Sequence, residues 1–350
     1  MYMQKINRQF TFWFGLLAVF ICLTGCVRGQ DTNQSKHTTR LFAMGTYMTF
    51  TGYGKDAESA LSRAAERVKE LEALWSATDE NSEIYKVNHS KGSPVTVSSE
   101  TGELLRFTLD IAEQTGGALD PTIYPLMDTC GFVNGEYHIP AEQELASLLQ
   151  GMSFEKVALR ENTITLPEGV QLDLGAVGKG CAGAELSKLL KSQGITSALL
   201  DIGGNIQMIG ARPDGAKWRL GIKHPLSEGT LGTVEAEDCA VVTSGKYERY
   251  FTGEDGRLYW HILDPTTGKP ADSGLASVTI IAKDGKLCDA LSTAVFVMGL
   301  EEGTEYWRSR DDFEMLLMTQ EGEVYLTEGI EQDFTMNDSL SNKEVHVIER

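Results

Sequence analysis

The chain has 350 residues, of which 41% are hydrophobic, enough apolar material for the core of one large domain or two modest ones. Lysine and arginine number 31 against 50 aspartates and glutamates, so the formal net charge is −19. This acidity argues against a general nucleic-acid binder, whose affinity depends on cationic groups that neutralise phosphates.

The first residues have the features of a bacterial lipoprotein signal. Lys5 and Arg8 precede the apolar run Phe10–Leu23, which is short for a membrane span. The run ends at Leu23-Thr24-Gly25-Cys26, which resembles a lipobox, in which the cysteine is lipidated and becomes the new N-terminus. The alternatives are a secretory peptide with a coincidental cysteine or an uncleaved anchor. The small residues before Cys26 favour lipidation.

The remaining chain divides by composition. We expect a signal peptide over residues 1–25, a flexible polar tether over 26–39, a folded domain over 40–332 and a polar, frayed tail over 333–350. A lipidated Cys26 predicts a protein anchored in the cell membrane that faces outside the cytoplasm.

Hydrophobic periodicity predicts helices mixed with strands in the folded domain. Helices are predicted at Asp56–Trp75, Ser98–Thr115, Ala141–Gln150, Cys181–Gln193 and Leu287–Gly299. Strands are predicted at Leu41–Gly52, with a break at Met44-Gly45-Thr46, and at Ser197–Ile209, where Gly203-Gly204 indicates a bulge or a close backbone approach. Val170–Gly180 is predicted as a strand that runs into a glycine-rich turn. Further strands are predicted at Trp218–Lys223, Leu231–Thr243 and Ser277–Ala282, and hairpins at Lys156–Leu166 and Phe313–Leu326. No repeat or break in composition divides this part, so the predicted class is α+β, a single domain of mixed sheets and packed helices.

The cysteines do not indicate a metal–thiolate site. Four of the six lie beyond the signal, at Cys130, Cys181, Cys239 and Cys288, with no CxxC pair and no histidine at zinc spacing. We expect them to be small buried residues. A location outside the cytoplasm permits disulfides, but the spacing assigns no partners.

A short run at 289–294 carries hard oxygen donors on a helix. Helical spacing brings Asp289 and Thr293 onto one face, with Ser292 beside them. A carboxylate and hydroxyls are ligands that Mg²⁺ accepts while it keeps positions open for water or phosphate. Taken alone, the run is better explained by an aspartate that interacts with the helix dipole and by hydroxyls that bond back to the helix.

A second run, Val170–Gly180, leads through a glycine-rich turn into a helix. Such a turn presents backbone N–H groups and a helix N-terminus to a phosphate. Its glycine spacing matches neither the P-loop nor the dinucleotide-binding fingerprint. Because glycine turns between strands and helices are common, this signal is weak alone.

Seven unusual loops follow one another along the chain: MGT at 44–46, ALDPT at 118–122, LDLGAVGKG at 172–180, DIGGN at 201–205, TSGKYERY at 243–250, HILDPTTGKP at 261–270 and DALSTA at 289–294. In order and spacing, over residues 40–330, they resemble the ApbE family of extracytoplasmic flavin transferases. The resemblance implies an ApbE-like, T-fold-like domain. It also implies an enzyme that cleaves the pyrophosphate of FAD, transfers FMN to a Thr or Ser hydroxyl of a target protein through a phosphoester bond, and releases AMP.

The resemblance also implies roles for individual residues. It assigns Mg²⁺, with Mn²⁺ as the alternative, to Asp289, Thr293, Ser292 and the backbone carbonyl of Ala176. It assigns FAD binding to Met44, Ala118, Leu119, Asp120, Asp173, Lys179 and the backbone of Leu263. It makes His261 the general base, a role that suits a group titrating near neutrality.

Three of these residues have structural alternatives or depart from the family pattern. Asp120 precedes a proline and is also a common turn former. Lys179 is also explained as a solvated cation at a helix start. Ser292 stands where some members have a second carboxylate, which predicts weaker metal binding in the absence of substrate.

The implied partners are FAD and an extracytoplasmic redox protein, either an Rnf- or Nqr-type electron-transport subunit or an FMN-carrying reductase. Two other functions need a similar pocket. One is a Mg²⁺-dependent FAD pyrophosphatase, in which water replaces the acceptor hydroxyl and yields FMN and AMP. The other is a non-catalytic FAD-binding lipoprotein that stores or delivers the flavin.

Overall fold

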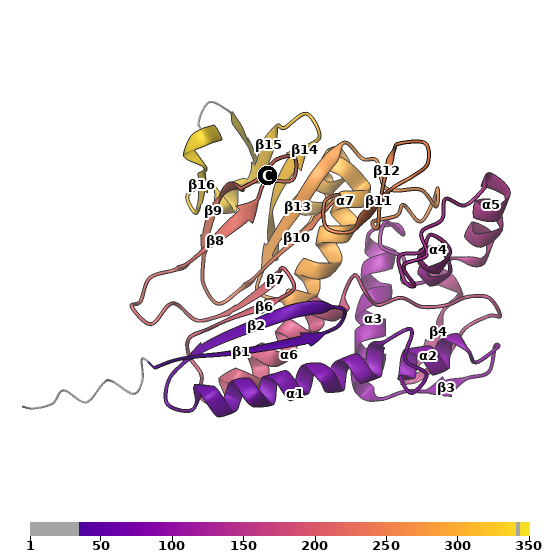
Figure 1. The fold of residues 1–350 in the computed structure, drawn as a ribbon, viewed down its shortest axis with the longest axis horizontal. Helices are drawn as coiled ribbons and strands as arrows, with labels where there is room; N and C mark the ends of the chain where they lie inside the picture. The colour runs from indigo at the N-terminus through magenta and orange to yellow at the C-terminus, as the bar shows by residue number, and fades with distance from the viewer. Residues whose placement is uncertain (1–34, 341–343) are drawn as a thin grey trace, which may run out of the picture.

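The computed structural model describes residues 35–340 and 344–350. Its centre is a nine-stranded sheet with the strand order β1-β2-β6-β7-β10-β13-β14-β15-β17 (Figure 1). Neighbouring strands in this sheet are antiparallel, except for the parallel pair β15 and β17. Smaller sheets have the orders β16-β9-β8, β3-β5-β4 and β11-β12. The predicted α+β class, with mixed sheets and packed helices in one domain, is therefore confirmed.

The central strands are β1 (Lys36–Ala43), β2 (Thr46–Tyr53), β6 (Ala198–Ile202), β7 (Asn205–Ile209), β10 (Ala240–Gly245), β13 (Leu275–Ala282), β14 (Phe313–Thr319), β15 (Val324–Thr327) and β17 (Val345–Ile348). The other strands are β3 (Val95–Thr96), β4 (Ala158–Arg160), β5 (Thr163–Thr165), β8 (Trp218–Lys223), β9 (Thr230–Ala236), β11 (Tyr250–Thr252), β12 (Leu258–Trp260) and β16 (Phe334–Met336). The helices are α1 (Ala57–Trp75), α2 (Glu83–Asn88), α3 (Ser99–Gln114), α4 (Tyr124–Thr129), α5 (Glu142–Gly151), α6 (Gly178–Ser192) and α7 (Gly285–Arg308).

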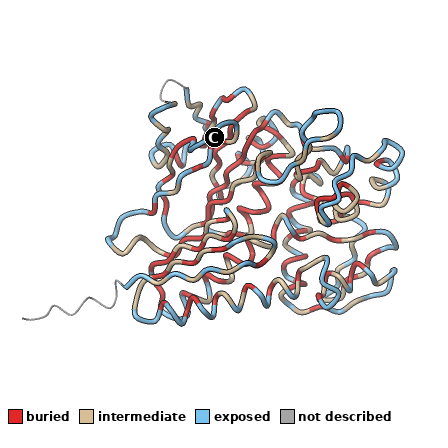
Figure 2. The backbone as a smooth tube through the Cα atoms, in the orientation of Figure 1, coloured by how far each residue is buried: buried red, intermediate tan, exposed pale blue. Residues whose placement is uncertain are grey.

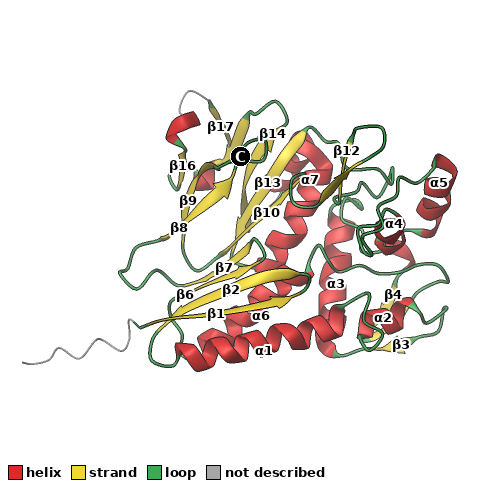
Figure 3. Cartoon of the chain, viewed as in Figure 1, coloured by secondary structure: helices red, strands yellow, loops and turns green. Residues whose placement is uncertain are grey.

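The central sheet is covered on both faces. Helix α1 packs against β1 and β2, while α7 packs against β10, β13 and β14 (Figure 3). On the other face, apolar residues of β8 and β9 share a hydrophobic cluster with residues of β7, β10, β13, β14 and β15. Strand β13 lies within these layers, and all eight of its residues are buried. This explains its unbroken apolar sequence, which lacks the alternation of a half-exposed strand.

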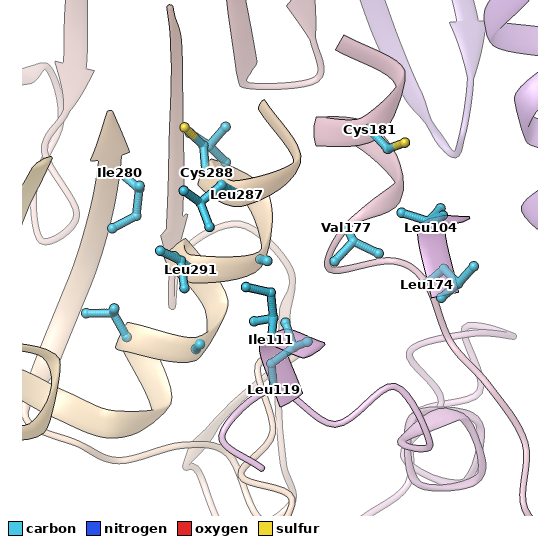
Figure 4. Packing of buried hydrophobic residues seen from close by; sticks show 14 of the residues in the cluster. Leu104, Ile111, Leu119, Leu174, Val177, Cys181, Ile280, Leu287, Cys288 and Leu291 are labelled. Carbon is cyan, nitrogen blue, oxygen red and sulfur yellow. The ribbon is translucent and has the colours of Figure 1, made fainter. Parts of the chain in front are cut away.

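The largest hydrophobic cluster lies under the segments that form the site. Buried residues run along the central strands and the inner faces of the helices (Figure 2). Leu287 and Leu291 of α7 belong to the same hydrophobic cluster as Leu174 and Val177, which lie just before the start of α6 (Figure 4). The two helices that carry the predicted metal and phosphate residues therefore share one packed core.

Two segments predicted as single interrupted strands are hairpins. Leu41–Gly52 turns back at Met44-Gly45, where φ is +50° and +70°, and the chain pairs Ala43 with Thr46. Ser197–Ile209 turns back at Gly203-Gly204, where φ is +62° and +93°. Positive φ at both central residues is the geometry of a two-residue hairpin turn, so the glycines mark a reversal of direction and not a bulge.

Three other predicted elements differ in extent. Leu231–Thr243 contains two strands, β9 and β10, which lie in different sheets. Val170–Gly180 is not a strand, because only Gln171 forms an isolated bridge, to Ile123, and α6 begins at Gly178. Helix α7 passes Gly299, where φ is +84° and ψ is −173°, and resumes to Arg308. The remaining predicted helices and strands are found within a few residues of their expected positions.

The predicted boundaries of the domain are wrong at both ends. The tether predicted over 26–39 is already strand from Lys36, because an edge strand is held by backbone pairing with β2 and tolerates polar side chains. The tail predicted over 333–350 contains β16 and β17, and Ile348 is buried. The predicted signal peptide and Cys26 lie outside the described residues. None of the described helices is long and apolar enough to cross a membrane.

The four described cysteines form no disulfide with one another. Cys130, Cys181 and Cys288 are buried, as predicted, whereas Cys239 is partly exposed. Burial raises the pKa of the Cys181 thiol to about 12, so it behaves as an inert apolar side chain at neutral pH.

Candidate active site

The seven loops singled out in the sequence meet around one cavity of about 740 Å³, a size typical of small-molecule sites. Its lining includes eleven of the twelve predicted metal, flavin and catalytic residues: Met44, Ala118, Leu119, Asp120, Asp173, Ala176, Lys179, His261, Leu263, Asp289 and Thr293. The twelfth, Ser292, does not line it. The fold therefore brings together residues that lie up to about 250 positions apart in the sequence.

Two hairpin turns form part of the cavity wall and contact each other. Met44 adopts a left-handed conformation, which is uncommon for a bulky residue, and its amide donates a hydrogen bond to Glu72 of α1 over 2.6 Å. Gly203 approaches Thr46 so closely that a Cβ atom at position 203 would lie 2.4 Å from the threonine side chain. Glycine is thus required at position 203 by this contact as well as by the positive φ angle there.

Asp289 is a buried carboxylate at the junction of α6 and α7. Its side chain is 5% exposed, and its Oδ2 accepts a hydrogen bond from the amide of Gly180 over 2.8 Å. The helices meet so closely at this point that a Cβ atom on Gly180 would lie 2.2 Å from the carbonyl oxygen of Gly285. Burial raises the pKa of Asp289, and the charge of Lys179 and the Gly180 amide oppose that shift. The carboxylate is therefore held by groups that favour its charged form.

The start of α6 supplies one of the cations that line the cavity, Lys179. The Nζ atom of Lys179 lies 3.9 Å from Oδ1 of Asp289 and 3.4 Å from the carbonyl oxygen of Gly175. Its side chain is 28% exposed, so it is neither solvated like a surface lysine nor locked in the core. A lysine in this position can contact an anionic group placed in the cavity.

The oxygen donors around Asp289 fit a divalent cation such as Mg²⁺. Gly180 lies in the first turn of α6, where amides have no acceptor within the helix, and its amide donates to Asp289, so the Ala176 carbonyl before the helix is left for another group. The Thr293 hydroxyl has no hydrogen-bond partner within the described residues and faces the cavity. Together these residues offer one carboxylate, one hydroxyl and one carbonyl. No cluster of three histidine, cysteine or acidic residues exists in the described ranges, so ligand phosphates would have to complete the shell.

Ser292 is placed differently from its predicted role as a metal ligand. It is fully buried, donates to the carbonyl oxygen of Asp289 over 2.9 Å and lies 2.8 Å from the hydroxyl of Ser244. Its position on the helix, one residue before Thr293, turns it from the cavity toward β10. Ser292 is thus a link between α7 and the sheet.

Asp120 and Asp173 organise the loops beneath the cavity. Asp120 accepts hydrogen bonds from the amide and hydroxyl of Thr122, over 2.8 and 2.7 Å, and from the Phe154 amide over 3.1 Å. Both of its oxygens are used, which supports the structural alternative for this residue. Asp173 accepts from the Gly175 amide over 2.5 Å, and burial raises its pKa. These bonds shape the backbone that carries Ala176 and Lys179.

His261 lines the cavity with a defined orientation. Its Nδ1 is 3.2 Å from the carbonyl oxygen of Arg249. Because a carbonyl only accepts, Nδ1 carries the hydrogen and leaves Nε2 as the basic nitrogen of the neutral ring. Burial, and then the charge of Arg249, lower the pKa of His261 to about 4. The imidazole is therefore unprotonated at neutral pH and able to accept a proton.

The polar residues that line the cavity without having been predicted individually include Asn205, Ser244 and Arg249. Asn205 is 6% exposed, and its Nδ2 meets the geometry of no hydrogen bond among the described residues, although its side chain lies close enough to Asp289 to oppose the raised pKa of that carboxyl. A buried donor of this kind is a candidate contact for a bound anion or carbonyl. All three lie in loops that the sequence had marked as unusual, DIGGN and TSGKYERY, but nothing in those loops identified the individual side chains.

The family model of the ApbE family matches residues 44–317, which include every loop of the cavity. The chain belongs to the ApbE family. A relative from Treponema pallidum named FAD:protein FMN transferase is 32% identical over 343 residues, which cover 91% of this chain and 94% of the relative. A relative of the same name from Vibrio cholerae is 31% identical and covers 83% of this chain and 89% of the relative.

Solved structures of ApbE proteins have the same fold. The ApbE protein of Thermotoga maritima superposes with a TM-score of 0.80 at 30% identity, covering 85% of this chain and 99% of that protein. The flavin transferase ApbE of Vibrio cholerae superposes with a TM-score of 0.77 at 26% identity, over 85% and 99%. The resemblance inferred from the seven loops is thereby confirmed at the level of family and fold.

Proposed function

We propose that this protein is an FAD:protein FMN transferase that transfers FMN from FAD to a Ser or Thr hydroxyl of another protein. The observation that carries the proposal is that Asp289, Lys179 and His261 line one cavity, from α7, α6 and the end of β12. Family membership supports the choice of FAD, because relatives that cover most of the chain are named for this reaction.

The reaction requires positioning and charge neutralisation more than covalent chemistry. The acceptor oxygen attacks the phosphorus of the FMN half, and the bond from that phosphorus to the bridging oxygen breaks. AMP leaves with the electron pair of that bond. The proton of the acceptor hydroxyl passes to Nε2 of His261, and Lys179 contacts the negative charge of the pyrophosphate.

Asp289, Thr293 and the Ala176 carbonyl are the residues that would hold Mg²⁺, or Mn²⁺, in this mechanism. A bound divalent cation neutralises charge on the phosphates and makes AMP a better leaving group. Asp289 is kept in place by the Gly180 amide, so the ligand is preorganised by the contact between the two helices.

We infer further that the acceptor is an extracytoplasmic redox protein and that lipidation of Cys26 anchors the enzyme at the membrane. The support is the lipobox and the apolar run before it. Labelling with radioactive palmitate in a bacterial host tests the anchor. Label in the wild-type chain that is lost in Cys26→Ala supports lipidation, and equal labelling of both contradicts it.

The activity is tested by incubating the protein with FAD, Mg²⁺ and the flavin-accepting domain of an electron-transport subunit. A gain in acceptor mass of one FMN, abolished by EDTA, supports the transferase. Free FMN and AMP beside an unmodified acceptor would favour the pyrophosphatase, and intact bound FAD would favour a carrier.

A further inference from the structure

The hairpin of β11 and β12 begins and ends at the cavity. Arg249 directly precedes β11, His261 directly follows β12, and both line the cavity. The amide of His261 donates to the carbonyl oxygen of Arg249 over 3.0 Å and closes the base of the hairpin. The hairpin of β11 and β12 (Figure 1) is therefore joined directly to His261, the proposed general base.

The register of the hairpin shows which backbone groups face outward. Bonded and non-bonded pairs alternate along antiparallel strands. Arg249 with His261 and Gly253 with Arg257 are bonded pairs, at 3.0 and 2.9 Å. Leu258, opposite Thr252, and Trp260, opposite Tyr250, occupy the non-bonded positions between them. Their N–H and C=O groups consequently point away from β11, toward the outer edge of β12.

At Leu258 and Trp260 this outer edge has no partner among the described strands, whereas just beyond them the carbonyl oxygen of Ile262 accepts from the Ala271 amide over 2.9 Å. Within the described ranges β11 and β12 form a sheet of two strands. In the part of the chain that the structure describes, the backbone groups of Leu258 and Trp260 form no hydrogen bond to another element or loop. The amides and carbonyls of Leu258 and Trp260 are therefore spaced as in an unpaired edge strand. Such an edge can pair with a further strand.

The side chains around the hairpin are apolar and exposed. Leu258 is 54% exposed and Tyr250 is 50% exposed, on one face. On the other face, the ring of Phe251 stacks between Tyr137 and Tyr259 at centroid distances of 4.5 and 5.2 Å. Tyr137 is itself 51% exposed. Exposed aromatic and aliphatic groups gathered at one place indicate an interaction site for protein.

We propose that an extended segment of the acceptor protein pairs with the outer edge of β12 and brings its Ser or Thr hydroxyl to His261. This inference rests on the proposed function, which requires a polypeptide substrate. A strand advances about 3.3 Å per residue and Trp260 directly precedes His261, so a segment that pairs at Leu258 and Trp260 and leaves the edge before Ile262 ends beside His261. Backbone pairing supplies affinity, and alternate side chains of the segment contact Leu258 and Trp260 of β12.

Three variants of the full chain separate backbone pairing from side-chain contacts. Leu258→Pro removes the outward amide but none of the hydrogen bonds within the hairpin. Leu258→Thr keeps that amide and removes only the apolar side chain. Thr252→Pro makes the matched change on the outer edge of β11. The probe is the flavin-accepting domain of an electron-transport subunit. Its binding is measured with FAD and EDTA, and its KM is measured with FAD and Mg²⁺.

We expect Leu258→Pro to weaken binding of the acceptor domain about tenfold or more and to raise its KM by a similar factor. FAD affinity and the thermal midpoint stay at wild-type values, and Thr252→Pro and Leu258→Thr remain within about threefold. Wild-type acceptor binding in Leu258→Pro overturns the proposal, as does an equal loss in Thr252→Pro. If Leu258→Pro loses acceptor binding while even the wild-type chain transfers no FMN, the result supports pairing of the acceptor with β12 and contradicts the proposed function.

Discussion

Nζ of Lys179 lies 3.9 Å from Oδ1 of Asp289, and these two residues come from different helices. The contact exists because Gly180 lets α6 approach α7 without a side chain between them. It places Lys179, at the end of the glycine-rich turn, beside Asp289, the carboxylate of the DALSTA run. The residues proposed to bind phosphate and those proposed to bind the metal therefore form one structural unit.

Replacing Lys179 with methionine tests its role as a phosphate contact. We expect FAD affinity to fall about tenfold to a hundredfold, because a charge-assisted bond is lost while the aliphatic stem is kept. Lys188→Met is the control, since Lys188 lies on the same helix but is 70% exposed and pairs with Glu185 on the surface. Fluorescence titration with FAD measures both. Equal affinities in the two variants would exclude the phosphate contact.

Asp289→Asn tests the metal site with little change in shape. The amide oxygen can still accept from Gly180, so the variant is expected to fold. We predict that Mg²⁺ no longer raises the thermal midpoint and that FMN transfer falls at least about a hundredfold. Asp284→Asn is the matched control, because Asp284 caps α7 through the Lys286 amide and asparagine caps equally well. A normal Mg²⁺ response in Asp289→Asn would place the metal elsewhere.

His261→Gln tests the general base. We expect transfer to slow by about a hundredfold to ten-thousandfold at unchanged FAD affinity, because the proton acceptor is lost and the cavity is retained. In the wild-type protein the pKa of His261 is about 4, so its base form is fully present above about pH 5 and kcat/KM should fall only at more acidic pH. A wild-type rate in His261→Gln would refute the assigned role.

The same pKa predicts a pH dependence of stability. The folded-state pKa of His261, about 4, lies below its ordinary value of 6.5. Between these values the unfolded chain binds the proton more readily, so the free energy of unfolding decreases as pH falls through that window. Urea unfolding at several pH values measures the slope. We expect a shallower slope in His261→Gln, and identical slopes would show that the histidine is not shielded in the folded state.

Gly180→Ala tests the close approach of the helices. An added Cβ would lie 2.2 Å from the Gly285 carbonyl oxygen and 2.5 Å from the Asp289 Cβ, so the helices must separate. We expect a loss of about 1–3 kcal/mol in the free energy of unfolding. Gly178→Ala, on the same helix, meets no atom within 4 Å and should be neutral or slightly stabilising. Equal stability of the two variants in urea would contradict this packing.

The sequence was sufficient to predict most of the fold, and eleven of the twelve residues predicted for the site line the cavity. The helix around Asp289 follows from its apolar period, and the role of the glycine turn follows from the loops that accompany it. Ser292 was misassigned because helical spacing places it beside Thr293 but does not say that Ser244 of β10 lies opposite it.

The errors in the fold have a common physical cause. Met44-Gly45 and Gly203-Gly204 were expected to interrupt strands, yet each reverses the chain, because local sequence does not show which strands pair. The last strand, Val345–Ile348, alternates only weakly and gains its place by pairing with β15. The conformation of these segments is therefore set by pairing with strands that are distant in the sequence or not evident from it.

The central claim is that FMN passes directly from FAD to a protein hydroxyl. The most direct test is to measure released AMP and acceptor-bound FMN in the same reaction, with excess acceptor domain and limiting FAD. The account predicts one bound FMN for each AMP released, with no free FMN. AMP accompanied by an equal amount of free FMN, and by no modified acceptor, would contradict it and make the protein a pyrophosphatase.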